Sequence, residues 1–168
     1  MGWDELLSGP FWIRLAVALA CGGAIGFERQ LRGKPAGMRT SMLVCLGTLM
    51  FVRLGVSLEG PHVDPSRVLG QVVTGIGFLG AGVILTRGGQ VLGITSAAVM
   101  WVLAAIAAAV ALDHVGAAIA TTLTTVGILV GLNAIERGFG AMRRGVHAEE
   151  PRPQDQADEN RYSGPWGP

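Results

Sequence analysis

The sequence is poor in charge and in cysteine. Charged residues make up 15% of its 168 positions, well below the roughly 25% usual in soluble domains. Its two cysteines, Cys21 and Cys45, stand apart, so neither a disulfide framework nor a zinc ligand set is indicated. A net charge of +1 says nothing about nucleic acid, because the placement of the charges matters more; we expect no nucleic-acid partner.

Recognisable catalytic motifs are also missing. Gly33 and Lys34 lack the leading glycine and the following hydroxyl of a phosphate-binding loop, and no HExxH occurs. The three histidines lie far apart, which does not favour a metal site. The stretch GFLGAG at 77–82 resembles a dinucleotide loop only superficially, because it lies inside a hydrophobic run. We therefore expect no enzymatic activity, no cofactor and no metal site.

What the sequence does contain is long apolar runs. Half of its residues are hydrophobic, and a membrane-crossing helix needs about 20 such residues. Two of the runs form one long buried hairpin if the chain is soluble, but their faces are almost free of the polar residues such a protein needs. The pattern predicts an all-α polytopic membrane protein, a bundle of about five transmembrane helices near 11–27, 40–58, 68–86, 91–112 and 115–133.

The predicted domain organisation follows from these runs. Residues 1–10 form a short N-terminal segment and 11–137 the transmembrane domain. Residues 138–168 form a cytoplasmic tail, which from Gly145 onward has four prolines, five acids and little to bury. Such a composition predicts disorder.

The cations are unevenly divided between the loops. Three of them, Arg14, Arg53 and Arg67, fall on one side of the predicted membrane, and eight fall on the other. Since cytoplasmic loops carry an excess of Lys and Arg, the N-terminus is predicted outside and the C-terminus in the cytoplasm. The cations on the predicted cytoplasmic side are Arg29, Arg32, Lys34, Arg39, Arg87, Arg137, Arg143 and Arg144.

Small residues form stripes along several runs. Glycines at Gly70 and Gly77 share one face of the third run, and Gly75 and Gly82 share another with Gln71. The fifth run repeats the device, with Gly127 among its members. Because small residues let helices approach closely in lipid, we expect tight packing in the bundle and a homo-oligomer or contact with other membrane proteins. Pore lining is the alternative.

Polar residues near the membrane have two interpretations each. Gln71 is either an interhelical staple or a substrate contact. Glu28, beside Arg29, either orders the loop by an ion pair or binds an ion. Asp64, near Arg67, either caps the third helix or meets a cation at a pore mouth. The structural interpretation is favoured for Gln71 and Asp64, and for Glu28 both interpretations stay open.

Three blocks of the sequence resemble the MgtC/SapB family of bacterial membrane proteins. They lie at 26–47, 64–85 and 93–112, in the order the family has them, and the resemblance covers roughly 10–137. It implies a five-helix domain in the cytoplasmic (inner) membrane. The positions that match the family's motifs are Glu28, Arg29, Gly37, Arg39 and Thr40 in the first block, and Asp64, Arg67, Gln71, Gly75, Gly77, Gly80 and Gly82 in the second.

The resemblance also carries functional expectations. Members of this family are associated with survival at low magnesium and, in pathogens, with growth inside macrophages. It implies a non-enzymatic factor that acts on other membrane proteins such as the ATP synthase. The alternatives are a subunit of a Mg²⁺ or other cation transporter or channel, and a lipid-handling protein whose basic loop 29–39 binds anionic head groups. Longer members carry a soluble C-terminal domain where this sequence has only its tail.

Overall fold

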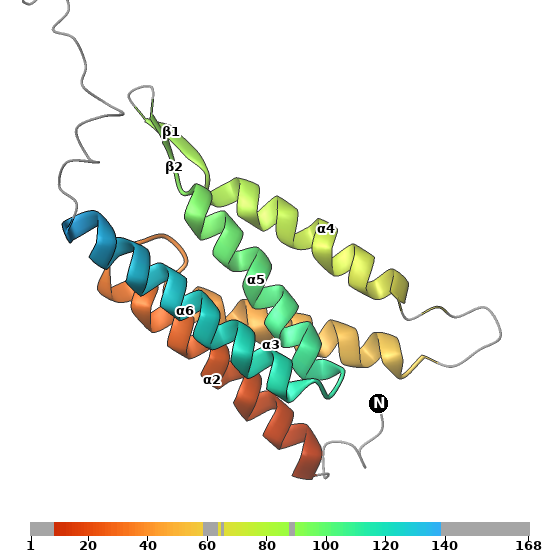
Figure 1. Cartoon of the computed structure of the whole chain (residues 1–168). Coiled ribbons are helices and arrows are strands. Elements are labelled where there is room, and N and C mark those ends of the chain that lie inside the picture. Colours follow the sequence, from red (N-terminus) through yellow and green to blue (C-terminus); the bar gives the residue numbers. More distant parts are fainter. Residues whose placement is uncertain (1–8, 59–63, 65, 88–89, 139–168) are drawn as a thin grey trace, which may run out of the picture. The chain divides into compact units, whose positions relative to one another are not determined.

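The computed structural model describes residues 9–58, 64, 66–87 and 90–138, without the side chains of 87 and 133–138. The chain divides into a unit that ends at Val130 and a second that begins at Gly131, of which the last turns of one helix are described. Five described helices are long and apolar enough to cross a membrane, which confirms the predicted all-α membrane fold (Figure 1). They are α2 (Gly9–Leu31), α3 (Met38–Val56), α4 (Ser66–Val83), α5 (Ile94–Ala111) and α6 (Val115–Gly138).

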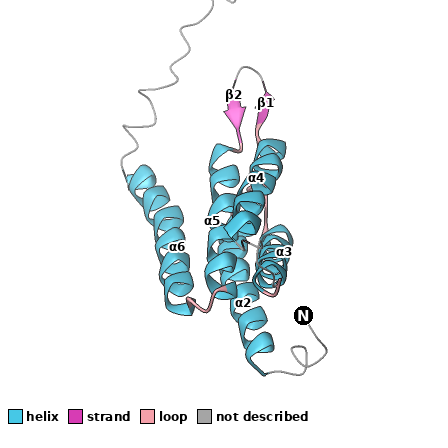
Figure 2. Ribbon diagram, turned by 90° about the vertical axis from the view of Figure 1, so that its right-hand side faces the viewer, coloured by secondary structure: helices cyan, strands magenta, loops and turns pink. Residues whose placement is uncertain are grey.

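Two short strands between α4 and α5 correct the predicted ends of the third and fourth spans. The expected helices over 68–86 and 91–112 give way to β1 (Leu85–Arg87) and β2 (Gln90–Leu92). The strands pair antiparallel, with Leu85 opposite Leu92, and the hairpin stands beyond the ends of α4 and α5 (Figure 2). Hydropathy does not distinguish an apolar strand from one more helical turn, so the runs looked continuous. Of the predicted terminal segments, residues 1–8 and 139–168 lie outside the described residues.

The α2–α3 pair is built on two glycines spaced four residues apart. A side chain at Gly22 would place its Cβ 2.8 Å from Cys45 Sγ, and one at Gly26 would place it 2.6 Å from the Cα atom of Met38. Neither position has room for a methyl group, so the two helices meet backbone to backbone. This is the close approach that small residues permit between helices in lipid.

Helix α5 is the centre of the core. It packs against α2, α3 and α4, and half of its span is buried, the largest share among the five. Its fully buried side chains meet apolar side chains of α2 and α3 in one cluster. The main members of this core are Ala18, Cys21 and Ile25 from α2, Cys45, Leu49 and Val52 from α3, and Leu103, Ile106, Ala107 and Val110 from α5.

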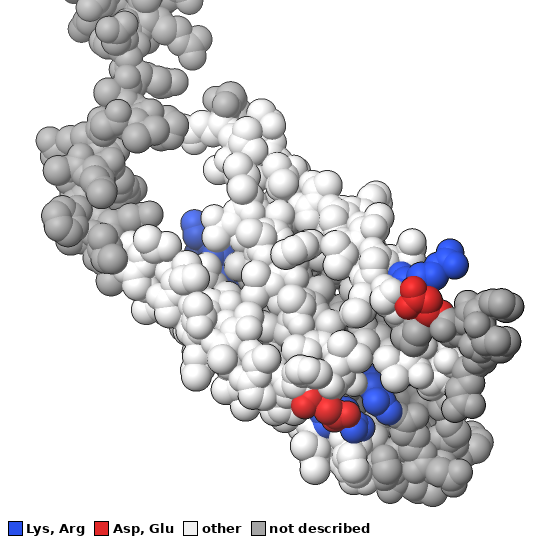
Figure 3. Space-filling view, turned by 45° about the vertical axis from the view of Figure 1, so that its right-hand side comes forward, with Lys and Arg blue, Asp and Glu red and all other residues white. Residues whose placement is uncertain are grey.

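Large apolar side chains point outward along the whole unit. Phe78 on α4 is 81% exposed and Leu123 on α6 is 68% exposed. Figure 3 shows a broad uncharged face, with charged side chains gathered near its edges. A contiguous apolar surface of this extent is foreign to soluble monomers, but it is what hydrocarbon requires.

An ion pair joins the start of α2 to the turn between α5 and α6. Arg14 Nε donates to Asp113 Oδ1 at 2.6 Å, and a second guanidinium nitrogen donates to Oδ2 at 3.0 Å. Asp113 adopts a left-handed conformation, with φ of 65°, after α5 ends. Arg14 is one of the three cations predicted on the outer side, and the structure gives it Asp113 as a partner.

Acid is expected to release this ion pair. The hydrogen bond from Arg14 lowers the pKa of Asp113 below its ordinary value of 3.8. A carboxyl group with a lowered folded-state pKa stabilises the fold above its ordinary pKa, and this contribution is lost as the pH falls through the folded value. In detergent at pH 7, Asp113→Asn should therefore melt below the wild type, as followed by circular dichroism. The difference should shrink as the pH falls below 3.8, and a constant difference would contradict the assignment.

Candidate functional site

A buried polar cluster lies where α2 ends, and it consists of Glu28, Arg29, Arg32 and Ser96. Glu28 and Arg29 are only 7% and 4% exposed. Arg29 Nη2 donates to Ser96 Oγ at 2.7 Å, and Arg32 Nε lies 2.8 Å from Glu28 Oε1. Arg32 Nη1 also donates to the carbonyl of Leu129 at 2.6 Å. The polar cluster therefore connects α2 to both α5 and α6.

Local structure explains how these side chains come together. Arg32 comes directly after the last residue of α2, four positions beyond Glu28, so the two side chains can meet on one side of the helix end. Gly33, with φ of 60°, leaves the helical conformation and ends α2 just beyond them. Ser96 belongs to the first turn of α5, which starts after Gly93 with φ of 91°. A side chain at Gly93 would collide with the carbonyl of Val83, so this glycine lets α5 start against the end of α4.

The polar cluster has more positive than negative charge. Two guanidinium groups surround one carboxylate, and Arg29 has a neutral hydroxyl as its partner. Within the described part of the chain, Glu28 Oε2 and Arg29 Nε are buried without any hydrogen-bond partner. Glu28 Oε1 has its ion pair but no hydrogen-bond geometry. Buried atoms of this kind usually have partners, and the excess positive charge favours an anionic oxygen or water over a divalent cation.

The other predicted polar residues lie away from the polar cluster. Arg39 and Thr40 are exposed in the first turn of α3, and Arg67 is exposed at the start of α4. Asp64 Oδ1 accepts a hydrogen bond from the backbone N–H of Ser66 at 2.9 Å, as expected of a residue that caps α4. Hydrogen bonding from the side chain and then the backbone of Ser66 lowers the pKa of the Asp64 carboxyl.

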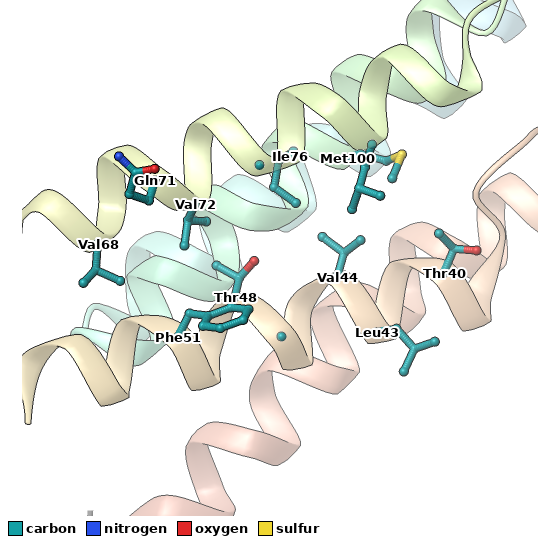
Figure 4. A pocket seen from close by; sticks show the side chains of 13 residues that line it. Thr40, Leu43, Val44, Thr48, Phe51, Val68, Gln71, Val72, Ile76 and Met100 are labelled. Atoms are coloured by element: carbon teal, nitrogen blue, oxygen red, sulfur yellow. The ribbon is translucent and has the colours of Figure 1, made fainter.

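A groove of about 590 Å³ runs between α3 and α4, with Met100 of α5 at its base. Figure 4 shows Val44 and Thr48 pointing from α3 toward Val72 and Ile76 of α4. Gln71 also lines this groove, but it is exposed and makes no hydrogen bond to any described residue. The rest of the groove wall is apolar or glycine, apart from Thr40 and Thr48. Within the described part of the chain, the Gln71 side chain joins no two helices by a hydrogen bond, so its role stays a prediction.

Most of the glycines predicted to pack helices face open space in this chain. Only Gly80 among them has a neighbour, since a methyl group added there would lie 3.5 Å from Ala97 Cβ on α5. A methyl group at Gly75, Gly77, Gly82 or Gly127 would meet nothing within 4 Å. These four positions therefore make no tight contact among the described residues; for the three on α4, the reason is that this helix contacts mainly α5. Packing between subunits at these glycines stays a prediction.

The described residues contain no group of three or more His, Cys, Asp or Glu side chains that could hold a metal ion.

The seven predicted polar residues divide among three places. Glu28 and Arg29 lie in the polar cluster, Thr40 and Gln71 line the groove, and the rest are exposed at helix starts. Arg32, Ser96 and Thr48 were not predicted. The spacing of Arg32 from Glu28 could have indicated it, whereas Ser96 and Thr48 carry no signal in the sequence.

Comparison with known proteins places most of the chain in one family. The model of the MgtC family matches residues 15–138. "Protein MgtC" of Brucella abortus (strain 2308) is 42% identical over 141 residues, which cover 79% of this chain and 56% of that protein. "Putative magnesium transporter YhiD" of Escherichia coli (strain K12) is 47% identical over 107 residues, or 60% of this chain and 50% of that protein.

A third relative shows the same partial coverage. "Protein MgtC" of Salmonella typhimurium (strain 14028s / SGSC 2262) is 39% identical over 120 residues, which cover 71% of this chain and 51% of that protein. The chain thus spans about half the length of the curated relatives it matches. No solved structure matches it.

Proposed function

The chain belongs to the MgtC family, and from that premise we propose that it is a non-enzymatic membrane factor in magnesium homeostasis. It is a multi-pass membrane protein, as its five apolar helices and its family indicate. The role in magnesium homeostasis is supported by the name of the relative YhiD. In this proposal the protein acts during adaptation to low magnesium by binding other membrane proteins, such as the ATP synthase.

The charged neighbours of Glu28 favour a regulatory factor over a transporter. Glu28 is the only carboxylate within the five candidate spans. It lies against Arg32 and beside Arg29, whose charges repel a divalent cation. Permeation of Mg²⁺ needs oxygen ligands or retained waters along a path, and a carboxylate held by guanidinium groups is a poor ligand. This favours a factor that binds partners over a conduit for the ion.

We further place the protein in the bacterial cytoplasmic membrane, with the N-terminus outside and the C-terminus in the cytoplasm. Arg32 and Lys34 lie in the α2–α3 turn, and Arg39 follows in the first turn of α3. Arg29 and Ser96 meet across α2 and α5, so this turn lies at the same end of the unit as the start of α5. An excess of cations at one end supports a cytoplasmic location for that end.

Growth and flux measurements together test the proposed function. A strain that lacks the gene should grow poorly at low magnesium and recover with the wild-type chain. Its inverted membrane vesicles should show altered ATP-driven proton pumping. Liposomes with the purified chain should take up no more Mg²⁺ than empty vesicles. Saturable uptake would overturn the proposal in favour of a cation transporter subunit, and unchanged pumping would exclude the ATP synthase as partner.

A further inference from the structure

The groove between α3 and α4 is an open side of the unit. Helix α4 has only 11% of its span buried, the smallest share among the five candidate spans, and Ile76 and Gly80 are its buried residues. The groove's base is well packed, because Val44, Ile76 and Met100 are all buried. A bilayer protein can leave such a surface to lipid, so the choice of occupant depends on the polar groups that line it.

Two polar side chains in the groove have no partner among the described residues. Thr48 is 3% exposed, and Figure 4 shows its hydroxyl directed into the space between α3 and α4. Neither Thr48 nor Gln71 makes a side-chain hydrogen bond to another described residue. Gln71 lies five residues into α4, about 7–8 Å along the helix axis, where hydrocarbon offers no donor or acceptor. A lipid chain would leave both groups unsatisfied, so the groove fits an occupant that carries polar groups itself.

The walls of the groove also suit another helix. Gly47 on α3 and Gly75 on α4 both line it, and a methyl group at either would meet nothing within 4 Å. Such positions let the backbone of a second helix approach closely. Arg67, Gln71 and Gly75 are spaced by four residues, so they share one face of α4. From the start of the helix, this face presents a guanidinium group, then an amide, and then a glycine that has no side chain.

We propose that the groove binds a second copy of this chain, with α4 of each copy against the groove of the other. Two copies inserted the same way are related by a two-fold axis along the membrane normal, so both α4 helices start at the same side. The Gln71 amide has both donors and acceptors, so it can pair with Gln71 or Thr48 of the other copy. Exposed Asp64 and Arg67 lie at the same end of α4, where each can meet its opposite charge across the axis. This proposal does not rest on the proposed function.

The interface is tested by the dimer dissociation constant of the full chain in liposomes. Single-molecule photobleaching over a range of protein densities measures this constant. Gln71→Leu should raise it by about 3- to 30-fold, the range for an interhelical polar bond in a membrane. Gly75→Leu should raise it at least as much, because the new side chain fills the space for the partner helix. Gly77→Leu is the matched control, since Gly77 also has open space but does not line the groove, and it should leave the constant unchanged.

A charge exchange tests the two-fold arrangement independently. Asp64→Arg copies and Arg67→Asp copies should each self-associate less than the wild type, because like charges then meet. Mixed together they should form heterodimers, because both ion pairs are restored. The proposal is overturned by a wild-type chain that stays monomeric at all densities, by Gly77→Leu acting as strongly as Gly75→Leu, or by charge variants that show no preference for each other.

Discussion

Replacing Gly26 by alanine should separate α2 from α3 and cost about 3 kcal/mol of stability, at the upper end of the range for overpacked cores. The new Cβ atom would lie 2.6 Å from Met38 Cα and 2.9 Å from both Cβ and Oγ of Ser41. Met38 presents backbone here and Ser41 is fully buried, so no flexible side chain can move aside. The expected result is a lower denaturant midpoint when helicity is followed by circular dichroism during titration of the micellar protein with SDS.

Gly23→Ala is the matched control for this variant. Gly23 lies on the same helix, and its added Cβ would stand 3.9 Å from the Met42 sulfur, an ordinary contact. Its stability should change by less than about 0.5 kcal/mol, or increase slightly because alanine favours helix over glycine. Equal losses in the two variants would mean that glycine at position 26 matters for a reason other than helix contact.

Removing the Glu28 carboxylate should be the most damaging single change, with a loss of about 3–5 kcal/mol for Glu28→Ala. Arg29 would stay almost fully buried, and Arg32 would keep its position beside Leu129, so two guanidinium groups would face each other without compensation. The same SDS titration measures the loss. Complementation at low magnesium should fail with it, because the uncompensated charges would destabilise the place where α2 meets α5 and α6.

A double-mutant cycle identifies the cause. If the loss comes from uncompensated charge, Glu28→Ala combined with Arg32→Met should lose less than the sum of the two single variants. Arg39→Met is the control, because Arg39 is exposed and lies outside the polar cluster. Its stability should change by less than about 0.5 kcal/mol. Strict additivity of Glu28→Ala and Arg32→Met would contradict a direct interaction between them.

Local features of this protein could be predicted from the sequence. The ion pair of Glu28 with Arg32 is one, because it depends only on a spacing of four along one helix. The cap on α4 is another, because Asp64 stands two residues before Ser66 and accepts a hydrogen bond from the backbone N–H of Ser66. The adjacent glycines Gly88 and Gly89 are a further local signal in the sequence, because paired glycines favour tight hairpin turns.

Contacts between distant segments could not be predicted. Arg29 and Ser96 are 67 positions apart in the sequence, and Arg14 and Asp113 are 99 positions apart. No periodicity in either helix specifies which residue of the other it will face. The glycines illustrate the same limit, since Gly22 and Gly26 are crowded by α3 whereas Gly75 and Gly77 meet nothing, although all four lie in similar apolar runs.

The five membrane crossings were determined by the sequence itself, because a bilayer requires about 20 apolar residues in a row and each run supplies them independently. The tertiary structure alone decided which faces of these helices meet and which stay open. The physical reason is that hydrocarbon and a neighbouring helix are equally apolar, so a residue that suits one suits the other. Only the packed arrangement shows that Glu28 and Arg29 are enclosed while Gln71 is left beside an open groove.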